Sequence, residues 1–165
     1  NPKGIATGKW IILTEGIFDA LTFLACGHPN VTCTFGTELT EDVRVVIAES
    51  GVERVLIGFD RDAEGDVGAQ SIARELAERG LEVLRIMFPR GMDVCDFARQ
   101  ADDPREALSR LVRHAEWVSG TPRSNVSTPV PSHSTVNAAP ATENPAPADD
   151  IILEFGERRW RVRGL

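Results

Sequence analysis

The chain has 165 residues, a mass of 18.0 kDa and 42% hydrophobic residues, enough to build one domain of ordinary size with its own core. No apolar stretch approaches the ~18 residues that a membrane span needs, and the first residues lack the pattern of a signal peptide. We therefore expect a cytoplasmic protein without a membrane partner. Its cysteines, Cys26, Cys33 and Cys95, form no CxxC pair, which disfavours a disulfide framework or a zinc knuckle and predicts reduced thiols in or near the core.

Charge is distributed unevenly along the chain. Residues 1–118 contain 13 Lys or Arg against 20 Asp or Glu, a balance of −7, whereas residues 119–165 are neutral. An acidic domain does not attract phosphate backbones by itself, so a function on nucleic acid would require bound cations or a basic neighbour. Because the chain does not begin with Met, we expect it to be a piece of a longer protein.

Apolar runs alternate with helical patterns over the first 118 residues, which predicts stacked βαβ units around a parallel sheet. Thr40 is expected to cap the second helix, and Gly80 is expected to end the third. The apolar face of the last predicted helix runs from Ala107 to Ala115. The predicted strands are 10–14, 31–35, 54–59 and 81–88, and the predicted helices are 17–25, 41–50, 67–79, a short one capped by Asp93 and one opened by Asp103-Pro104.

The composition changes after Val118. Residues 119–150 are rich in Ser, Thr, Pro, Asn and Ala, which predicts a disordered linker. Beyond it, the runs 151–155 and 159–163 flank Gly156-Glu157 and predict a β-hairpin. Since an isolated hairpin is marginal in water, we interpret residues 151–165 as the truncated start of a following domain. The predicted organisation is therefore a domain over 1–118, a linker over 119–150 and a partial domain over 151–165.

Acidic side chains follow two of the predicted strands. Glu15 comes directly after the first strand, and Asp60 and Asp62 follow the third. In parallel sheets ligands bind outside the carboxyl ends of the strands, and two carboxylates placed there can converge on one divalent ion that prefers oxygen ligands. The plainer alternative is a solvated loop whose acids favour the dipole of the next helix. We favour a metal site, because two acids one residue apart follow a buried strand.

Two other kinds of protein use a similar D-x-D pattern. An EF-hand would need a bidentate Glu where Ser71 stands and a helix before the loop, so this interpretation fails. A phosphatase with a nucleophilic Asp remains a weak alternative. Its motif is expected after the first strand, with Thr or Val in the place of Glu64.

Four short motifs occur in a specific order between Lys9 and Val118. They are Glu15-Gly16-Ile17-Phe18-Asp19-Ala20, Phe35-Gly36-Thr37-Glu38-Leu39-Thr40, Phe59-Asp60-Arg61-Asp62 and Gly91-Met92-Asp93-Val94-Cys95-Asp96. Together they resemble the Toprim domain of bacterial DnaG-type DNA primases. The last motif departs from the Gly-x-Asp-Pro-Asp stretch of primases, because Val94-Cys95 replaces the Pro and shifts the second acid to Asp96. Asp96 is therefore a weaker candidate than Asp93.

The resemblance implies a Toprim-like α/β fold of three layers. Its central sheet would be mainly parallel and four-stranded, with the strand order 2-1-3-4 and helices on both faces. It also implies a carboxylate cluster that holds Mg²⁺ or Mn²⁺. In that cluster Glu15 would be an acid/base group or a metal ligand, Asp60 and Asp62 would be the principal ligands, and Asp19, Asp93 and Asp66 would support them.

The implied function is metal-dependent phosphoryl or nucleotidyl transfer, as the catalytic core of a primase-like protein that makes RNA primers. The implied partners are a single-stranded DNA template and nucleoside triphosphates, reached through other domains, and a replicative helicase. Without a zinc-binding module and a basic lobe, this fragment is expected to be inactive alone.

Two further classes remain open at this point. One is a Toprim nuclease or a fragment of a topoisomerase, and the other is a non-catalytic module that binds metal and nucleic acid. The chain contains no Tyr, which disfavours strand cleavage by this piece through a tyrosyl intermediate. Asp19 has an equal alternative as an acid that favours the helix dipole. Lys9 and Arg61 are expected to be solvated cations, and His28 and His114 receive no role.

Overall fold

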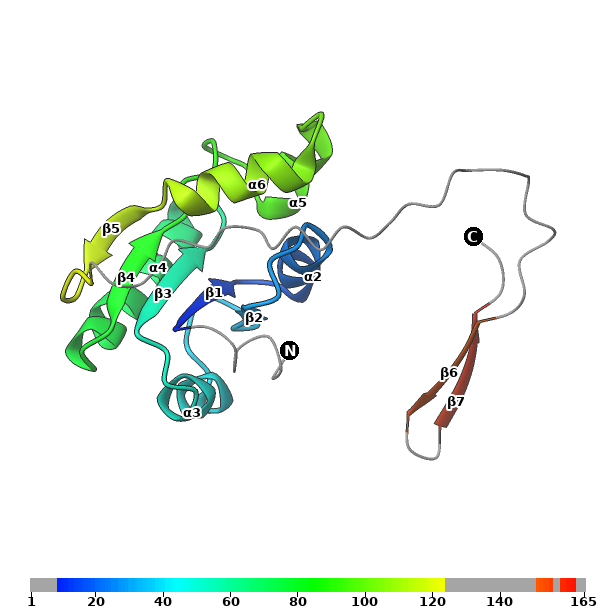
Figure 1. The fold of residues 1–165 in the computed structure, drawn as a ribbon, viewed down its shortest axis with the longest axis horizontal. Coiled ribbons are helices and arrows are strands. Elements are labelled where there is room, and N and C mark those ends of the chain that lie inside the picture. The colour runs from blue at the N-terminus through cyan, green and yellow to red at the C-terminus, as the bar shows by residue number, and fades with distance from the viewer. Residues whose placement is uncertain (1–8, 124–150, 156–157, 163–165) are drawn as a thin grey trace. The chain divides into compact units, whose positions relative to one another are not determined.

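The computed structural model describes residues 9–123, 151–155 and 158–162 of the chain (Figure 1). These ranges belong to two compact units, which are treated separately. The strands of the first range are β1 (Trp10–Thr14), β2 (Val31–Cys33), β3 (Arg54–Gly58), β4 (Glu82–Arg85) and β5 (Glu116–Ser119). Its helices are α2 (Ile17–Ala25), α3 (Glu41–Glu49), α4 (Ala63–Glu78), α5 (Val94–Gln100) and α6 (Pro104–Arg113).

The strands of the first range form one sheet in the order β2-β1-β3-β4-β5. The predicted order 2-1-3-4 is therefore confirmed, and these four strands pair in parallel. The expected number of strands is wrong by one, because β5 pairs antiparallel with β4. Its sequence Glu116-Trp117-Val118-Ser119 is mostly exposed and lacks the apolar alternation that predicts a strand. The last helix ends at Arg113, with His114 as its C-cap, and does not extend to Ala115.

Both faces of the sheet are covered by helices, which makes the three predicted layers (Figure 1). Ile11 and Leu13 of β1 pack toward α3 and α4, whereas Ile12 between them packs toward α2, α5 and α6. Strand β3 is divided in the same way: Val55 and Ile57 pack toward α3 and α4, whereas Leu56 packs toward the opposite helices. A strand that is buried on both faces is read as a continuous apolar run, which explains why these two strands were evident from the sequence.

Polar side chains fix the beginnings of most helices. The Thr40 hydroxyl accepts a hydrogen bond from the Val43 N–H, as predicted. The carboxylates of Asp62, Asp93 and Asp103 accept bonds from the third residue beyond each of them and so cap α4, α5 and α6. Helix α4 therefore begins at Ala63, four residues before the predicted start. The prediction missed this first turn because the turn is acidic and lacks the apolar spacing of a helix.

The second unit contains the predicted hairpin. Strands β6 (Ile151–Phe155) and β7 (Arg158–Val162) pair antiparallel, with Leu153 opposite Trp160. The turn at Gly156-Glu157 lies outside the described residues, as does most of the predicted linker, from residue 124 to residue 150. Ser119 at the start of that linker belongs to β5. The division into 1–118, 119–150 and 151–165 stays a prediction.

No helix in the described part of the chain is long and apolar enough to cross a membrane.

The turn after β2 lies against α4 at a position that only glycine fits. A Cβ atom added to Gly68 would lie 2.6 Å from the Thr37 Cβ and 2.9 Å from the Thr37 carbonyl oxygen. Gly68 thus allows the segment after β2 to approach the helix that follows the Asp60 loop.

We predict that Gly68→Ala lowers the free energy of unfolding by about 1–3 kcal/mol, because overpacking outweighs the gain in helix propensity. Ser71→Ala, at an exposed position of the same helix, should change it by less than about 0.5 kcal/mol. Chemical denaturation of both variants measures the difference. A Gly68→Ala protein that is as stable as the parent would mean that the Thr37 turn does not depend on this contact.

Candidate metal centre

The acidic motifs meet at the carboxyl ends of β1 and β3. These strands are neighbours, and Thr14, the last residue of β1, is in register with Gly58, the last residue of β3. Glu15 therefore leaves the sheet next to the segment that carries Asp60. Helix α2 packs on one face of the sheet and α3 on the other, so this edge is the switch point where ligands bind in open α/β sheets.

Backbone and hydroxyl groups hold the segment around Glu15 in place. Thr14 is fully buried, and its hydroxyl donates to the Gly16 carbonyl at 3.0 Å. From the turn after β2, the Gly36 N–H donates to the Glu15 carbonyl at 3.2 Å, and the Thr34 N–H donates to the Thr14 carbonyl at 3.0 Å. The Glu15 backbone is thus fixed from two strands.

The loop after β3 is held just as closely. Arg85, a buried residue of β4, donates a hydrogen bond of 2.9 Å to the Asp60 carbonyl. A Cβ atom on Gly65 would lie only 2.4 Å from that carbonyl oxygen, so glycine is required where the first turn of α4 crosses the loop. The Asp62 carboxylate accepts a 2.8 Å bond from the Gly65 N–H. Asp60 and Asp62 therefore owe their positions to the start of α4.

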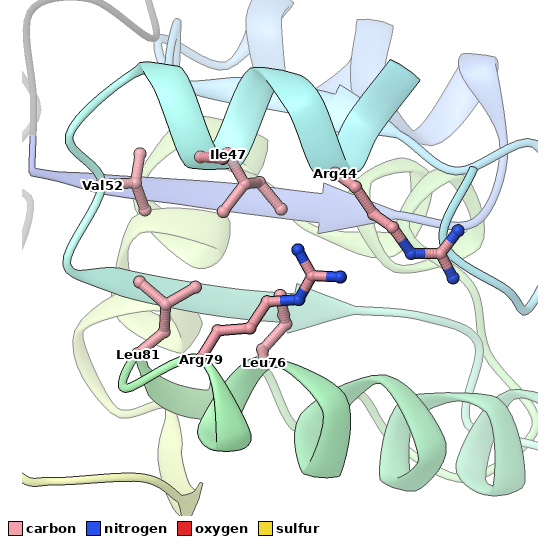
Figure 2. A pocket seen from close by; sticks show the side chains of 7 residues that line it. Arg44, Ile47, Val52, Leu76, Arg79 and Leu81 are labelled. Atoms are coloured by element: carbon pink, nitrogen blue, oxygen red, sulfur yellow. The ribbon is translucent and has the colours of Figure 1, made fainter. Parts of the chain in front are cut away.

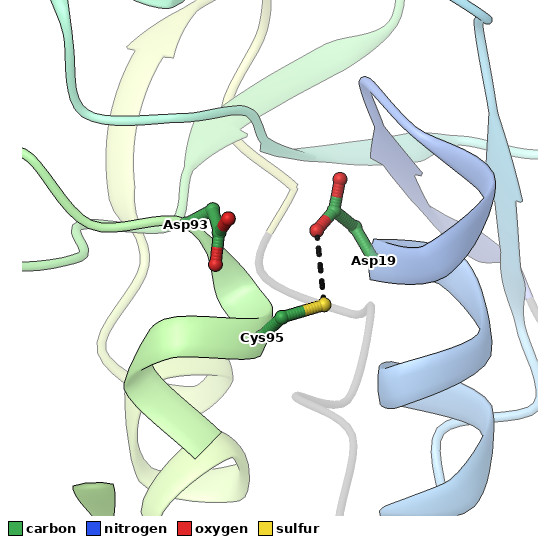
Figure 3. Close-up of side chains that lie close together, drawn as sticks. All are labelled: Asp19, Asp93 and Cys95. Carbon is green, nitrogen blue, oxygen red and sulfur yellow. Dashed lines mark hydrogen bonds between the residues drawn. The ribbon is translucent and has the colours of Figure 1, made fainter. Parts of the chain in front are cut away.

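A second group of ligand atoms lies between the starts of α2 and α5, as Figure 3 shows. Asp19 of α2 lies opposite Asp93 and Cys95, and one ligand atom from each of the three lies within 4.8 Å of the others. Asp19 is only 9% exposed; its carboxylate accepts a 3.1 Å bond from the Gly16 N–H and lies 3.6 Å from the Cys95 sulfur. Among the described residues no other set meets this distance criterion, so Glu15, Asp60 and Asp62 form no set of three as close as this one.

Electrostatic coupling nevertheless joins the two groups. Burial, followed by the charges of Asp19, Asp93 and Asp62, raises the pKa of Asp60 to about 6, against a small lowering by Arg85. Burial and the charge of Asp60 are the largest causes that raise the pKa of Glu15. Burial also raises the pKa of Asp19, although the Gly16 N–H opposes this. The carboxylates are close enough to disfavour one another's charge.

These residues fit a divalent cation by the chemistry of their donors. Carboxylate oxygens are the ligands that hard cations prefer, and a bound cation would reverse the mutual repulsion that raises the pKa of Asp60. Asp19 and Asp93 take part in no ion pair with Lys or Arg within the described residues, so no cationic side chain already neutralises them.

Two further acids of the motifs, Asp66 and Asp96, already have arginine partners. Asp66 pairs with Arg61 at 2.8 Å and with Arg85 at 3.3 Å, and Asp96 pairs with the exposed Arg99. Their charges are already neutralised by arginine, which argues against both as ligands. Cys95, which sequence reasoning placed only among core thiols, is the member of its motif that joins Asp93. Its place in the motif was the available signal.

The remaining singled-out residues have structural partners. Lys9 pairs with Glu53 at 2.6 Å, before the start of β1 and so at the opposite end of that strand from Glu15. His28 is buried within hydrogen-bond distance of the Ser109 hydroxyl, and burial lowers the pKa of His28 to about 4. His28 is therefore a neutral, packed histidine at physiological pH.

A cavity of about 300 Å³ lies between α3 and the end of α4 (Figure 2). It contains none of the predicted site residues. It is lined by Arg44, Ile47, Ala48, Val52, Leu76, Arg79 and Leu81.

The parallel sheet, its helices and the acidic switch point define a Toprim fold. Residues 12–98 match the model of the Toprim-like family, and the chain belongs to that family. Its Toprim domain is close to those of bacterial DnaG-type primases.

The individual similarities are to DNA primases. The DNA primase of Clostridium acetobutylicum is 32% identical over 108 residues, which are 66% of this chain and 18% of that protein. The DNA primase of Chlamydia muridarum is 30% identical over 117 residues, or 71% of this chain and 19% of that protein. The crystal structure of Aquifex aeolicus primase, with zinc-binding and RNA polymerase domains, gives a TM-score of 0.63 at 28% identity, over 71% of this chain and 28% of that one. The chain thus spans less than a fifth of these two curated relatives.

We predict that Asp60→Asn stabilises the metal-free protein at pH 8. A folded-state pKa of about 6, above the ordinary 3.8, means that ionised Asp60 opposes folding, and that this penalty is relieved as the pH falls from about 6 toward 4. The free energy of unfolding of Asp60→Asn should therefore exceed that of the parent at pH 8 and approach it near pH 4. Denaturant titrations in the presence of a chelator measure both.

Asp102→Asn, at an exposed position between α5 and α6, is the control and should show no such pH-dependent gain. A stability difference for Asp60→Asn that is the same at pH 4 and pH 8 would contradict the crowding of charges at Asp60.

Proposed function

We propose that this chain is the Toprim catalytic core of a cytoplasmic, DNA-primase-like nucleotidyltransferase. The observation that carries the proposal is the placement of Glu15, Asp60 and Asp62 directly after the neighbouring strands β1 and β3, with Asp19 and Asp93 close enough to raise the pKa of Asp60. A single-stranded DNA template and nucleoside triphosphates would be the substrates, reached through other parts of the protein. A replicative helicase would be a partner of the whole protein.

Mg²⁺ or Mn²⁺ is the proposed cation. Asp60 and Asp62 would hold it, with Glu15, Asp19 and Asp93 contributing further oxygens. Once bound, the cation would neutralise phosphate charge and stabilise the leaving oxygen of a phosphoryl transfer. The domain carries a net charge of −7 over residues 1–118, so its own surface supplies no comparable attraction for phosphate.

Glu15 is the proposed proton acceptor. In primer extension a hydroxyl oxygen of the growing strand bonds to the phosphorus of an incoming nucleotide while the bond to pyrophosphate breaks, and the hydroxyl proton must pass to a base. Burial and the charge of Asp60 raise the pKa of Glu15, which makes this carboxylate a stronger base than an isolated one. The hydrogen bond from the Gly36 N–H to the Glu15 carbonyl fixes the backbone that carries this base.

Arg85 is the proposed support of this arrangement. It is buried, donates to the Asp60 carbonyl and pairs with Asp66, so it ties the Asp60 loop to the first turn of α4. Its charge also lowers the pKa of Asp60, although less than the surrounding acids raise it. Arg85 would thus keep Asp60 in place without occupying the cation site.

We predict that Asp60→Asn and Asp62→Asn each weaken Mg²⁺ or Mn²⁺ binding by at least about tenfold. Asparagine at position 62 retains the helix-capping ability and removes only the charge. Asp103→Asn is a matched control, because Asp103 caps α6 in the same manner outside the site. Calorimetric titration of the 165-residue chain measures binding, and equal affinities for the parent and the Asp60 and Asp62 variants would exclude the metal assignment.

We predict that Glu15→Gln in the full-length protein reduces ribonucleotide incorporation on a single-stranded template by about 10²–10⁴-fold, because the base is lost. Glu49→Gln, at the exposed end of α3, should retain the parental rate. The assay follows labelled nucleotide in primers. Undiminished synthesis by Glu15→Gln would leave Glu15 a structural role, and DNA cleavage without synthesis by the parent protein would favour a Toprim nuclease.

A further inference from the structure

A second cavity, of about 340 Å³, lies between α4 and the strands β4 and β5. Its walls include two arginines, Arg61 from the loop after β3 and Arg85 of β4, and a tryptophan, Trp117 of β5. Among the described residues that line it, none is a ligand of the proposed cation site. The cavity is therefore a feature that the proposed function does not use.

The two arginines are buried against the same carboxylate. The exposed fraction of the side chain is 7% for Arg85 and 14% for Arg61, so Arg61 is not the solvated cation that was expected. Both donate to one oxygen of Asp66, at 2.8 Å from Arg61 and 3.3 Å from Arg85. Burial, and to a lesser degree the charge of Arg61, lowers the pKa of Arg85, against the opposing charge of Asp66. Two positive charges thus share one paired carboxylate oxygen.

Each guanidinium also has a nitrogen that makes no hydrogen bond. In the described part of the chain, Nε of Arg61 and Nη1 of Arg85 are the buried side-chain polar atoms that lack a partner. Buried donors without an acceptor cost free energy. Phosphate oxygens accept well from guanidinium N–H groups, often two at a time. A phosphate in the cavity would therefore satisfy donors that the protein leaves unpaired.

Both arginines are held in place by other contacts. The Arg61 N–H donates to the Met92 carbonyl at 3.2 Å, and the Arg61 carbonyl accepts from the Gly91 N–H at 3.0 Å. Arg85 donates to the Asp60 carbonyl, and its guanidinium carbon lies 6.0 Å from the centre of the Phe59 ring. The donors are thus positioned in advance, which lowers the cost of ordering them around a ligand.

Trp117 adds an aromatic surface to this cavity. It belongs to the edge strand β5 and is 54% exposed, although it is a large apolar residue. Exposed aromatic rings beside bound phosphates serve as platforms on which nucleic-acid bases stack. A volume of about 340 Å³ is also in the range of small-molecule sites and exceeds what phosphate alone requires. The chemistry of the walls therefore fits a phosphate that carries a base.

A free nucleotide fits this cavity better than a nucleic-acid strand. A strand needs a basic track along its backbone, whereas residues 1–118 carry a net charge of −7. The exposed carboxylate of Glu116 also lines the cavity and would repel successive phosphates. Two buried guanidiniums suffice for one phosphorylated group.

We propose that Arg61, Arg85 and Trp117 form a metal-independent pocket for a mononucleotide, with a phosphate on the two guanidiniums and the base on the indole ring. The pocket goes beyond the proposed function, because these three residues are not ligands of the cation site. Its occupant would bind without Mg²⁺ or Mn²⁺.

Titration of the 165-residue chain with adenosine diphosphate, in the presence of a chelator, tests the pocket. Calorimetry should show binding, and stacking should quench tryptophan fluorescence. Arg61→Gln should weaken binding by at least about tenfold, because charge-assisted hydrogen bonds are lost. Trp117→Ala should also weaken it by about tenfold, whereas Trp117→Phe retains an aromatic ring and should bind within about threefold of the parent.

Arg110→Gln is the matched control, because Arg110 is an exposed residue of α6, on the other face of the sheet, and it should bind like the parent. Absence of binding by the parent chain, or parental affinity in Arg61→Gln or Trp117→Ala, would overturn the pocket. The Trp117 variants keep this test decisive even if Arg61→Gln does not fold, since they alter an exposed edge strand.

Two further ligands test the occupant. Inorganic phosphate should bind more weakly than adenosine diphosphate, and equal affinity would refute stacking on Trp117. Tighter binding of an oligothymidylate would replace the mononucleotide with a single strand and so overturn the proposal. Because the chelator removes divalent cations, failure here leaves the proposed function intact, just as equal Mg²⁺ affinities in the Asp60 and Asp62 variants would leave the pocket intact.

Discussion

Parallel hydrogen bonding between β1 and β3 holds together groups that repel one another. The register that places Thr14 beside Gly58 also brings Glu15 next to the Asp60 loop, and α2 and α5 add Asp19 and Asp93. Each backbone is fixed by apolar packing on both faces of the sheet, so the carboxylates cannot separate without disturbing the core. The rise in the pKa of Asp60 to about 6 is the electrostatic consequence.

The fold tolerates this crowding of carboxylates through hydrogen bonds from backbone N–H groups and through the buried side chain of Arg85. Asp19, Asp62 and Asp93 accept backbone hydrogen bonds near the beginnings of three helices, where the helix dipole favours negative charge. Arg85 approaches Asp60 from β4 and binds its carbonyl. Glycine at position 65 lets that carbonyl lie under the first turn of α4. The site is therefore part of the local architecture, and the most polar edge of the sheet is also one of its most constrained.

The sequence predicted those features that depend on patterns local to the chain. Strand Trp10–Thr14 and helix Ile17–Ala25 were predicted at their observed bounds, since apolar runs and helical spacing define them. Strand β5 was missed, because an exposed edge strand has no alternation and owes its form to pairing with β4. The prediction that Asp19 and Asp93 belong to one carboxylate cluster rested on the resemblance to Toprim domains. The arginine partners of Asp66 and the place of Cys95 depend on long-range packing, which a single sequence does not reveal.

The caps of α4 and α5 have a thermodynamic consequence. One oxygen of Asp62 is bound to the Gly65 N–H, and one oxygen of Asp93 is bound to the Asp96 N–H, which leaves the second oxygen of each for other ligands. A cation bound to these carboxylates would therefore change the strength of the capping hydrogen bonds and the stability of the first turns of both helices. By linkage, fraying of those turns and occupancy of the site influence each other equally. Amide hydrogen exchange at Gly65 and Asp96 would thus report on an ion that touches neither backbone.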